Sequence, residues 1–327
     1  IIKFHIKNII LIHIMKSLTT MLKKTMRSIS KINIWIRLFI FLGVLFVTLN
    51  YVNYNHRGPE GFTQMEKFKV MKNDNLYDDF YCSIYDDLVH DSAKNDYEVR
   101  ELSRILKPSK NKTLVDMGCG RGHHVDLFNK KGFNASGLDI SPAMIEKAKK
   151  KYPKSEFKKG NALDAVTYKQ SSIDVISCLY FTIYYIHEKK MFIDNCYNWL
   201  KPGGHFVLHL VNRDKFDPII NSADPLHIVS AQKYAKKRIT NSLVKFKDFQ
   251  YKGNFEFDKP NNKAEFVETF KDDSSGNVRK NVHTLHMETQ KQILALAKQT
   301  GFILKGKIDL TKTMYEYQYI YILYKPE

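Results

Sequence analysis

Cysteine is scarce in this chain, and no pair of cysteines has the spacing of a metal site. Cys82, Cys119, Cys178 and Cys196 form neither a CxxC nor a CxxxC motif. We therefore expect four free thiols in a reducing compartment, with no zinc centre, no other metal and no disulfide framework. Repeats and low-complexity tracts are also missing, and the apolar content suits a globular core of one large domain with appendages.

Acidic residues are absent from residues 1–59, which contain nine Lys or Arg. Half of the formal net charge of +18 therefore lies in this segment. The other basic residues form no stripe interleaved with aromatic residues, so no nucleic-acid partner is expected. We interpret residues 1–31 as a basic leader, within which Met15 offers an alternative start.

Residues 32–52 form a long apolar run, interrupted only by Asn33 and Arg37 near its start. A helix that crosses a bilayer needs about 20 mostly apolar residues. We therefore predict a single transmembrane helix and a membrane location, with an uncleaved signal or mitochondrial presequence as the alternative. The positive-inside bias favours a cytosolic amino terminus, whereas the free cysteines favour a cytosolic main domain. Sidedness stays open, with a cytosolic domain preferred, and residues 53–75 are interpreted as a linker.

A glycine-rich segment follows a short buried strand. The strand Thr113–Met117 is β-branched and apolar, and it leads into Gly-Cys-Gly-Arg-Gly at 118–122 and then a helical pattern. Alternating glycines allow a tight turn and bring backbone amides against a ligand, and the helix directs its positive end to the same place. Asp139 ends the next strand, where its carboxylate can accept both hydroxyls of a ribose. The segment therefore predicts a nucleotide-type binding loop.

The glycine spacing distinguishes two ligands. A dinucleotide fingerprint requires a small residue at the sixth position, where His123 stands, so NAD is disfavoured. The acidic Asp116 followed by Gly118, Gly120 and Gly122 resembles the first motif of class I S-adenosylmethionine (SAM) dependent methyltransferases. Three further stretches resemble the same family: Ile84-Tyr85-Asp86, the aromatic run at 178–186, and Leu-Lys-Pro-Gly-Gly at 200–204.

This resemblance implies a fold. From residue 113 onward the chain alternates strands with helices, which predicts a parallel sheet with right-handed crossovers. The family fold is α/β and Rossmann-like, with seven mostly parallel strands and an antiparallel last pair, and we place it at residues 76–327. Residues 229–285 alternate in the manner of strands between turn-rich segments, which predicts an inserted antiparallel β lid.

The implied cofactor is S-adenosyl-L-methionine. Asn161 stands where the family usually has Asp, and its carbonyl can still accept a hydrogen bond from the adenine amino group. The residues expected to bind the cofactor are Asp116, Gly118, Cys119, Gly120, Gly122, Asp139, Ile140, Met144, Asn161, Ala162, Cys178 and Leu179.

The expected reaction is methyl transfer to a nitrogen or oxygen of a small-molecule acceptor. A lipid or quinone methyltransferase at a membrane and a catalytically silent SAM-binding module are the alternatives. A base is needed if the acceptor is a hydroxyl or is protonated, and His209, Tyr184 and Tyr85 are the candidates by position. His209 also suits a buried core position, and the stripe of Tyr77, Tyr81 and Tyr85 suits packing as well as ligand contact.

Overall fold

The computed structural model describes residues 33–56, 67–72, 75–219, 232, 235 and 237–327. The chain divides into two compact units, Ile1–Pro59 and Glu60–Glu327. The predicted basic leader, residues 1–31, lies outside the described residues, as does half of the predicted linker.

The first unit contains one described helix, α2 (Ile34–His56). Among the residues that the structure describes, no helix combines the length and the apolar composition needed to cross a membrane. The predicted transmembrane helix and membrane location are therefore wrong. The run of apolar residues at 38–49 lies between Arg37 and Asn50. It is shorter than the roughly 20 apolar residues that span a bilayer.

A seven-stranded sheet organises the second unit. Its strands are β2 (Thr113–Met117), β3 (Asn134–Asp139), β4 (Glu156–Lys159), β5 (Ile173–Cys178), β6 (Leu200–Val211), β11 (Ile303–Asp309) and β12 (Gln318–Tyr324). Their order is β11-β12-β6-β5-β2-β3-β4. Pairing is parallel from β6 to β4, whereas β12 is antiparallel to both of its neighbours. The Rossmann-like α/β fold expected from the sequence is present.

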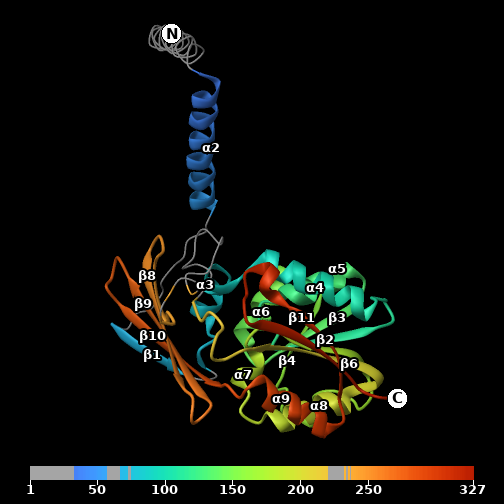
Figure 1. Ribbon diagram of the computed structural model, residues 1–327. Helices are drawn as coiled ribbons and strands as arrows, with labels where there is room; N and C mark the ends of the chain where they lie inside the picture. The colour runs from blue at the N-terminus through green and yellow to red at the C-terminus, as the bar shows by residue number, and fades with distance from the viewer. Residues whose placement is uncertain (1–32, 57–66, 73–74, 220–231, 233–234, 236) are drawn as a thin grey trace, which may run out of the picture. The chain divides into compact units, whose positions relative to one another are not determined.

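Helices cover both faces of this sheet (Figure 1). They are α3 (Asp79–Val89), α4 (Ser92–Leu106), α5 (His123–Lys131), α6 (Pro142–Lys151), α7 (Thr182–Tyr185), α8 (Lys189–Trp199) and α9 (Gln290–Thr300), with short 3-10 turns η2 (Ala165–Thr167) and η5 (Leu310–Thr313). One core cluster includes Val99 and Phe128 from α4 and α5, and another includes Trp199 and Ile293 from α8 and α9. Local signals start α6, where Ser141 accepts a hydrogen bond from the Met144 amide and Pro142 occupies the first turn.

Strand order positions the binding site. The chain runs from β2 outward to β3 and β4, and then crosses back to β5 and β6 on the other side of β2. At such a switch point the two connections leave the sheet in opposite directions, so a crevice opens at the carboxyl ends of β2 and its neighbours.

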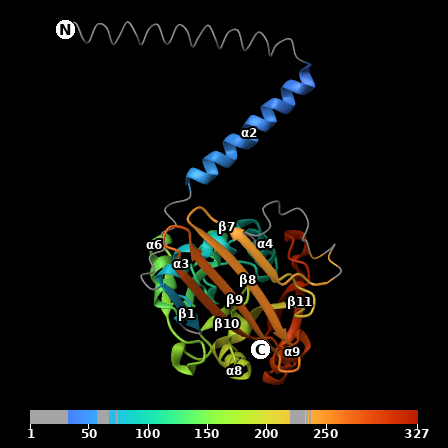
Figure 2. The ribbon, with the colours of Figure 1, turned by 90° about the vertical axis from the view of Figure 1, so that its left-hand side faces the viewer.

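A second sheet faces the viewer in Figure 2. Its strands are β1 (Phe68–Lys72), β7 (Asn241–Lys245), β8 (Phe249–Asp258), β9 (Lys263–Asp272) and β10 (Val278–His286). β7 to β10 form an antiparallel meander within the segment expected to be the lid, and β1 pairs in parallel with β10. Part of the predicted linker therefore forms strand β1. Its hydrogen-bond partners are on the open edge of β10, about 200 residues later in the chain.

Helix α3 is shared between the two layers. Tyr81, Ile84 and Leu88 of this helix belong to one buried cluster with Phe249 and Phe270 of the second sheet. The arrangement brings the aromatic face of α3 next to the crevice of the first sheet.

Candidate active site

One cavity of about 1120 Å³ joins the carboxyl ends of the parallel strands to the second sheet. Loops after β2, β3, β4 and β5 line it, together with α3, the start of α4, α7 and side chains from β8, β9 and β10. Of the twelve residues predicted to bind a cofactor, all except Gly122 and Cys178 are among its described lining residues.

The three glycines of the loop at 118–122 are required for different reasons. Gly118, Gly120 and Gly122 all have positive φ values of 70°, 51° and 81°, a conformation that glycine adopts at little cost. A Cβ added to Gly120 would meet nothing within 4 Å, so this residue opens onto the cavity. A Cβ on Gly122 would lie 2.5 Å from the Phe157 ring. Gly122 is therefore required by packing, whereas Gly120 leaves room for a ligand.

Asp139 holds the glycine loop in place. Its Oδ2 accepts a hydrogen bond of 2.8 Å from the Gly120 amide, and its Oδ1 accepts one of 2.9 Å from the Ser141 amide. Burial raises the pKa of this carboxyl despite those hydrogen bonds. Each carboxylate oxygen keeps a second lone pair for a ligand hydroxyl. The residue thus has a structural role that the sequence did not reveal.

Asp116 is the other acidic residue of the predicted motif. It is buried, and its Oδ1 accepts a hydrogen bond of 2.7 Å from the Ser177 hydroxyl on the neighbouring strand. Burial raises its pKa to about 6. The strand β2 therefore presents a carboxyl of reduced acidity at the floor of the cavity.

Three further predicted cofactor residues, Ile140, Asn161 and Cys178, differ in how accessible they are to a ligand. Ile140 is 46% exposed next to Asp139, as a residue that covers a flat ring would be. The side-chain oxygen of Asn161 accepts a hydrogen bond of 2.9 Å from the Leu163 amide, so one of its lone pairs is already used. Cys178 is fully buried, and burial raises the pKa of its thiol.

The three predicted base candidates lie in different places. Tyr85 lines the cavity, but Tyr184 and His209 are not among the described residues that line it. The Tyr184 hydroxyl accepts a hydrogen bond of 2.8 Å from the Val211 amide, so it stabilises the end of β6. His209 is fully buried, and burial lowers its pKa to about 4. The Gln318 side chain acts in the opposite direction and raises this pKa. Neither ring nitrogen of His209 has a hydrogen-bond partner of ordinary geometry among the described residues.

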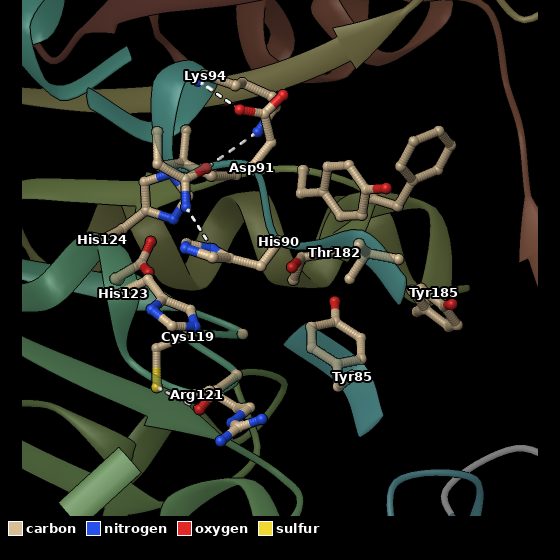
Figure 3. A pocket seen from close by; sticks show the side chains of 18 of the residues that line it. Tyr85, His90, Asp91, Lys94, Cys119, Arg121, His123, His124, Thr182 and Tyr185 are labelled. Carbon is tan, nitrogen blue, oxygen red and sulfur yellow. Dashed lines mark hydrogen bonds between the residues drawn. The ribbon is translucent and has the colours of Figure 1, made fainter. Parts of the chain in front are cut away.

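A histidine cluster ties α3 to the glycine loop on the left of Figure 3. His123 Nε2 lies 2.8 Å from Asp86 Oδ1, and Arg121 lies 3.3 Å from the same carboxylate. The His90 ring stacks on His123 with centroids 4.0 Å apart. Burial acts to raise the pKa of Asp86, but the hydrogen bond and charge of His123 lower it below its usual range. In the sequence, His123 had served only as evidence against an NAD site, and its contact with Asp86 was not predicted.

A second polar cluster lies at the start of α4. Lys94 Nζ lies 3.1 Å from Glu98 Oε1, and His124 Nε2 lies 2.8 Å from Glu98 Oε2. Burial acts to raise the pKa of Glu98, but the Lys94 ammonium and His124 bring it down to about 2. The Lys94 ammonium also lies 5.1 Å from the centre of the Tyr180 ring. The sequence offered no motif for this cluster.

A third cluster joins α7 to the second sheet. The Tyr185 hydroxyl lies 2.8 Å from His283 Nδ1, and His283 Nε2 lies 2.7 Å from Glu268 Oε2. Tyr251 donates a hydrogen bond of 3.0 Å to the other oxygen of Glu268. Sequence reasoning missed His283 and Glu268, since each appears only as one residue of an alternating strand.

The strand order, the glycine loop and the carboxylate after β3 define a Rossmann-like nucleotide-binding protein of the methyltransferase type. Residues 93–302 match the family model described as "Methyltransferase domain". The chain therefore belongs to this family, and its assignment to the class I SAM-dependent methyltransferases is confirmed. SAM is the cofactor of that class.

Two relatives and one solved structure illustrate the similarity. A probable SAM-dependent methyltransferase of Mycolicibacterium smegmatis is 27% identical over 35% of this chain and 44% of its own length. A dTDP-4-amino-2,3,4,6-tetradeoxy-D-glucose N,N-dimethyltransferase of Saccharopolyspora spinosa is 30% identical over 41% of this chain and 55% of its own. The chain thus spans about half the length of these relatives.

The solved structure is SAM-bound CalS10, an amino pentose methyltransferase from Micromonospora echinaspora. It superposes with a TM-score of 0.53 over 77% of this chain and 99% of its own, at 17% identity. At this level of identity, the superposition shows a shared fold and nothing more.

Proposed function

We propose that this chain transfers the methyl group of SAM to a nitrogen or oxygen atom of a small molecule. The observation that carries the proposal is this cavity, which joins a glycine loop and its carboxylate to a wall rich in tyrosine. Relatives that act on amino sugars support this class of acceptor.

The residues of the first sheet fit the cofactor. Gly120 leaves an open cradle that a side chain would fill, and the free lone pairs of Asp139 suit a ribose diol. Ile140 would cover the adenine, and the remaining lone pair of Asn161 would accept its amino group. When bound there, SAM supplies an electrophilic methyl group on a sulfonium ion.

The work of this chain is then to orient the acceptor and exclude water. The cavity lining includes Tyr77, Tyr81, Tyr85 and Tyr185, and we assign these tyrosines to the acceptor. Their ring faces suit an amine or a sulfonium through cation-π attraction. Tyr85 stays a candidate for direct contact with the acceptor.

The test is turnover by the full chain with methyl-labelled SAM. We expect S-adenosylhomocysteine to accumulate only when an acceptor is added, from a panel of nucleotide-linked amino sugars, free amines and phenols. Labelled product identifies the acceptor atom by mass spectrometry. SAM binding without turnover on any member of the panel would favour a silent binding module and contradict the proposal.

A further inference from the structure

The third cluster is a continuous chain of hydrogen bonds from a buried carboxylate to the cavity. Glu268 is fully buried and His283 is 1% exposed. Tyr185 is 36% exposed and lines the cavity, as His283 does, whereas Glu268 is not among the described lining residues. The carboxylate therefore lies behind the imidazole, and the phenol lies in front of it.

Helix α7 places this chain next to the glycine loop. A Cβ on Gly118 would lie 2.6 Å from the Thr182 hydroxyl, so the first residue of α7 contacts the loop. Tyr185 comes three residues later, and side chains at that spacing share one face of a helix. Figure 3 shows Thr182, Tyr185 and Tyr85 gathered on one side of the cavity. The Tyr185 hydroxyl thus stands one helical turn from the proposed cofactor site.

With an ionised Glu268 and a neutral His283, every donor in this chain of hydrogen bonds meets an acceptor. An ionised Glu268 only accepts, so it receives hydrogen bonds from the Tyr251 hydroxyl and from His283 Nε2–H. A neutral His283 then has a lone pair on Nδ1, which accepts the Tyr185 O–H. Burial raises the pKa of Tyr185, which keeps its hydroxyl protonated as this assignment requires.

We propose that Tyr185, His283 and Glu268 form a proton relay that deprotonates the methyl acceptor. The inference rests on the proposed function and specifies an acceptor that carries a hydroxyl or an ammonium group. The arrangement of carboxylate, imidazole and hydroxyl follows the logic by which a buried carboxylate orients and supports a histidine base.

The step balances in atoms and charge. As the acceptor atom forms its bond to the methyl carbon, the carbon–sulfur bond breaks and its electron pair stays on sulfur as a neutral thioether. The acceptor proton passes to the Tyr185 oxygen, and the Tyr185 proton passes to His283 Nδ1. The positive charge lost by the sulfonium appears on the imidazolium, where Glu268 faces it. The imidazolium returns its proton to solvent through Tyr185 after product release.

Few other polar groups face the imidazole. Tyr81 and Tyr77 present rings at 5.7 and 6.3 Å from it, and Phe266 lies at 5.5 Å. On its own strand, Lys280 lies three residues away on the opposite face, and Arg279, four residues away on the same face, forms an ion pair of 2.8 Å with Asp78. Glu268 is therefore the charged group in direct contact with the imidazole, and Tyr251 is hydrogen-bonded to its other oxygen, outside the path of the proton.

The first test needs no cofactor. We expect ¹⁵N NMR of the ligand-free full chain to show His283 as the neutral Nε2–H tautomer, with Nδ1 unprotonated. Tyr185→Phe should shift the Nδ1 resonance, because its hydrogen-bond donor is lost. An Nδ1–H tautomer in the wild type would overturn the relay.

The second test is kinetic, with the acceptor found in the turnover screen. Tyr185→Phe should lower kcat by about 100-fold or more, the usual contribution of a positioned base, while the SAM Kd stays within about twofold. His283→Gln should lower kcat by a similar factor, again with little change in the SAM Kd. The substitution at Tyr185 removes one oxygen from a partly exposed ring, so it leaves the fold intact.

Tyr251→Phe is the matched control. It removes the hydrogen-bond donor to the other oxygen of Glu268, and Tyr251 is not among the described residues that line the cavity, so kcat should change by less than about fivefold. Equal losses in Tyr251→Phe and Tyr185→Phe would indicate a structural network and sink the relay. If the wild type turns over and Tyr185→Phe has the same kinetics, the relay is refuted and the proposed function stands. If the wild type shows no turnover, the proposed function itself is refuted.

Discussion

The cavity has two walls that are built in different ways. On the cofactor wall, the contact between the Gly120 amide and Asp139 joins residues 19 positions apart. On the lid wall, the contact between Tyr185 and His283 spans 98 positions, and the pair of Asp78 and Arg279 spans 201. Backbone groups dominate the first wall, and side chains brought together by distant strands dominate the second.

This difference explains which parts of the site the sequence can reveal. A strand, a turn and a helix in succession determine where the amides of the glycine loop point, so spacing alone is informative. Glu268 and His283 share a face because β9 and β10 pair Glu268 with Asn281, which puts His283 diagonally across. A register shift of one residue would turn His283 to the opposite face.

Among substitutions in the cofactor wall, Gly120→Val should have the largest effect on SAM affinity. The side chain would project into the cavity, so we expect SAM binding to fall by more than about 100-fold, or roughly 2.7 kcal/mol. Isothermal titration calorimetry measures this loss. Gly276→Val is the matched control, since Gly276 has a φ of 69° and nothing within 4 Å of an added Cβ. It carries the same backbone strain outside the cavity lining, and its SAM affinity should stay normal.

The buried His209 gives a test of stability in acid. The folded pKa of His209, about 4, lies below the unfolded value of about 6.5, so the unfolded chain binds the proton more tightly. The stability is complete above about pH 6.5 and is lost as pH falls toward 4. We expect His209→Leu to remove about 2 kcal/mol of the decrease in unfolding free energy between pH 7 and pH 5.

Urea denaturation of both proteins at pH 7 and pH 5 measures the effect. Comparing the two pH values within each protein cancels the cost that the substitution has at pH 7 itself. A mutant that retains the full acid sensitivity of the wild type would show that other groups cause it.

Asp139→Ala tests the carboxylate of the cofactor wall. Charge-assisted hydrogen bonds contribute about 1.5 to 3 kcal/mol each, so SAM affinity should fall at least tenfold. Because Asp139 also accepts hydrogen bonds from the Gly120 and Ser141 amides, the ligand-free melting temperature should fall too. Calorimetry beside a thermal melt measures both. Normal SAM affinity with a lowered melting temperature would leave only the structural role.

Tyr85→Phe probes the lid wall with the smallest expected effect. Loss of one hydroxyl contact should raise the acceptor KM about fivefold, the equivalent of one hydrogen bond of about 1 kcal/mol, without changing SAM affinity. Tyr184→Phe is its matched control, since that hydroxyl binds the Val211 backbone. The control should lower stability by about 1 kcal/mol and leave KM unchanged. The reverse pattern would move the acceptor contact from Tyr85 to Tyr184.

Much of the fold follows from local sequence pattern, and the two errors of the sequence-based prediction have different causes. The alternation of strands and helices from residue 113 onward predicts the Rossmann-like sheet, and the turn-rich alternation at 229–285 predicts the meander. Hydrophobicity alone suggested a transmembrane helix at 32–52, whereas no described helix is long and apolar enough for that role. Strand β1 was not predicted because its hydrogen-bond partner is the edge of β10, and no residue near β1 in the sequence indicates that pairing.

The sequence by itself determined the glycine loop, the carboxylate after β3 and the family, because these depend on short-range spacing and on backbone conformations that favour glycine. Tertiary structure alone decided which tyrosines reach the cavity and which histidine meets a carboxylate. Tyr184 and Tyr185 are neighbours in the chain, yet one binds the β6 backbone and the other contacts His283. Side-chain partners of this kind depend on the register of distant strands and on how a lid packs over them, which no local pattern encodes.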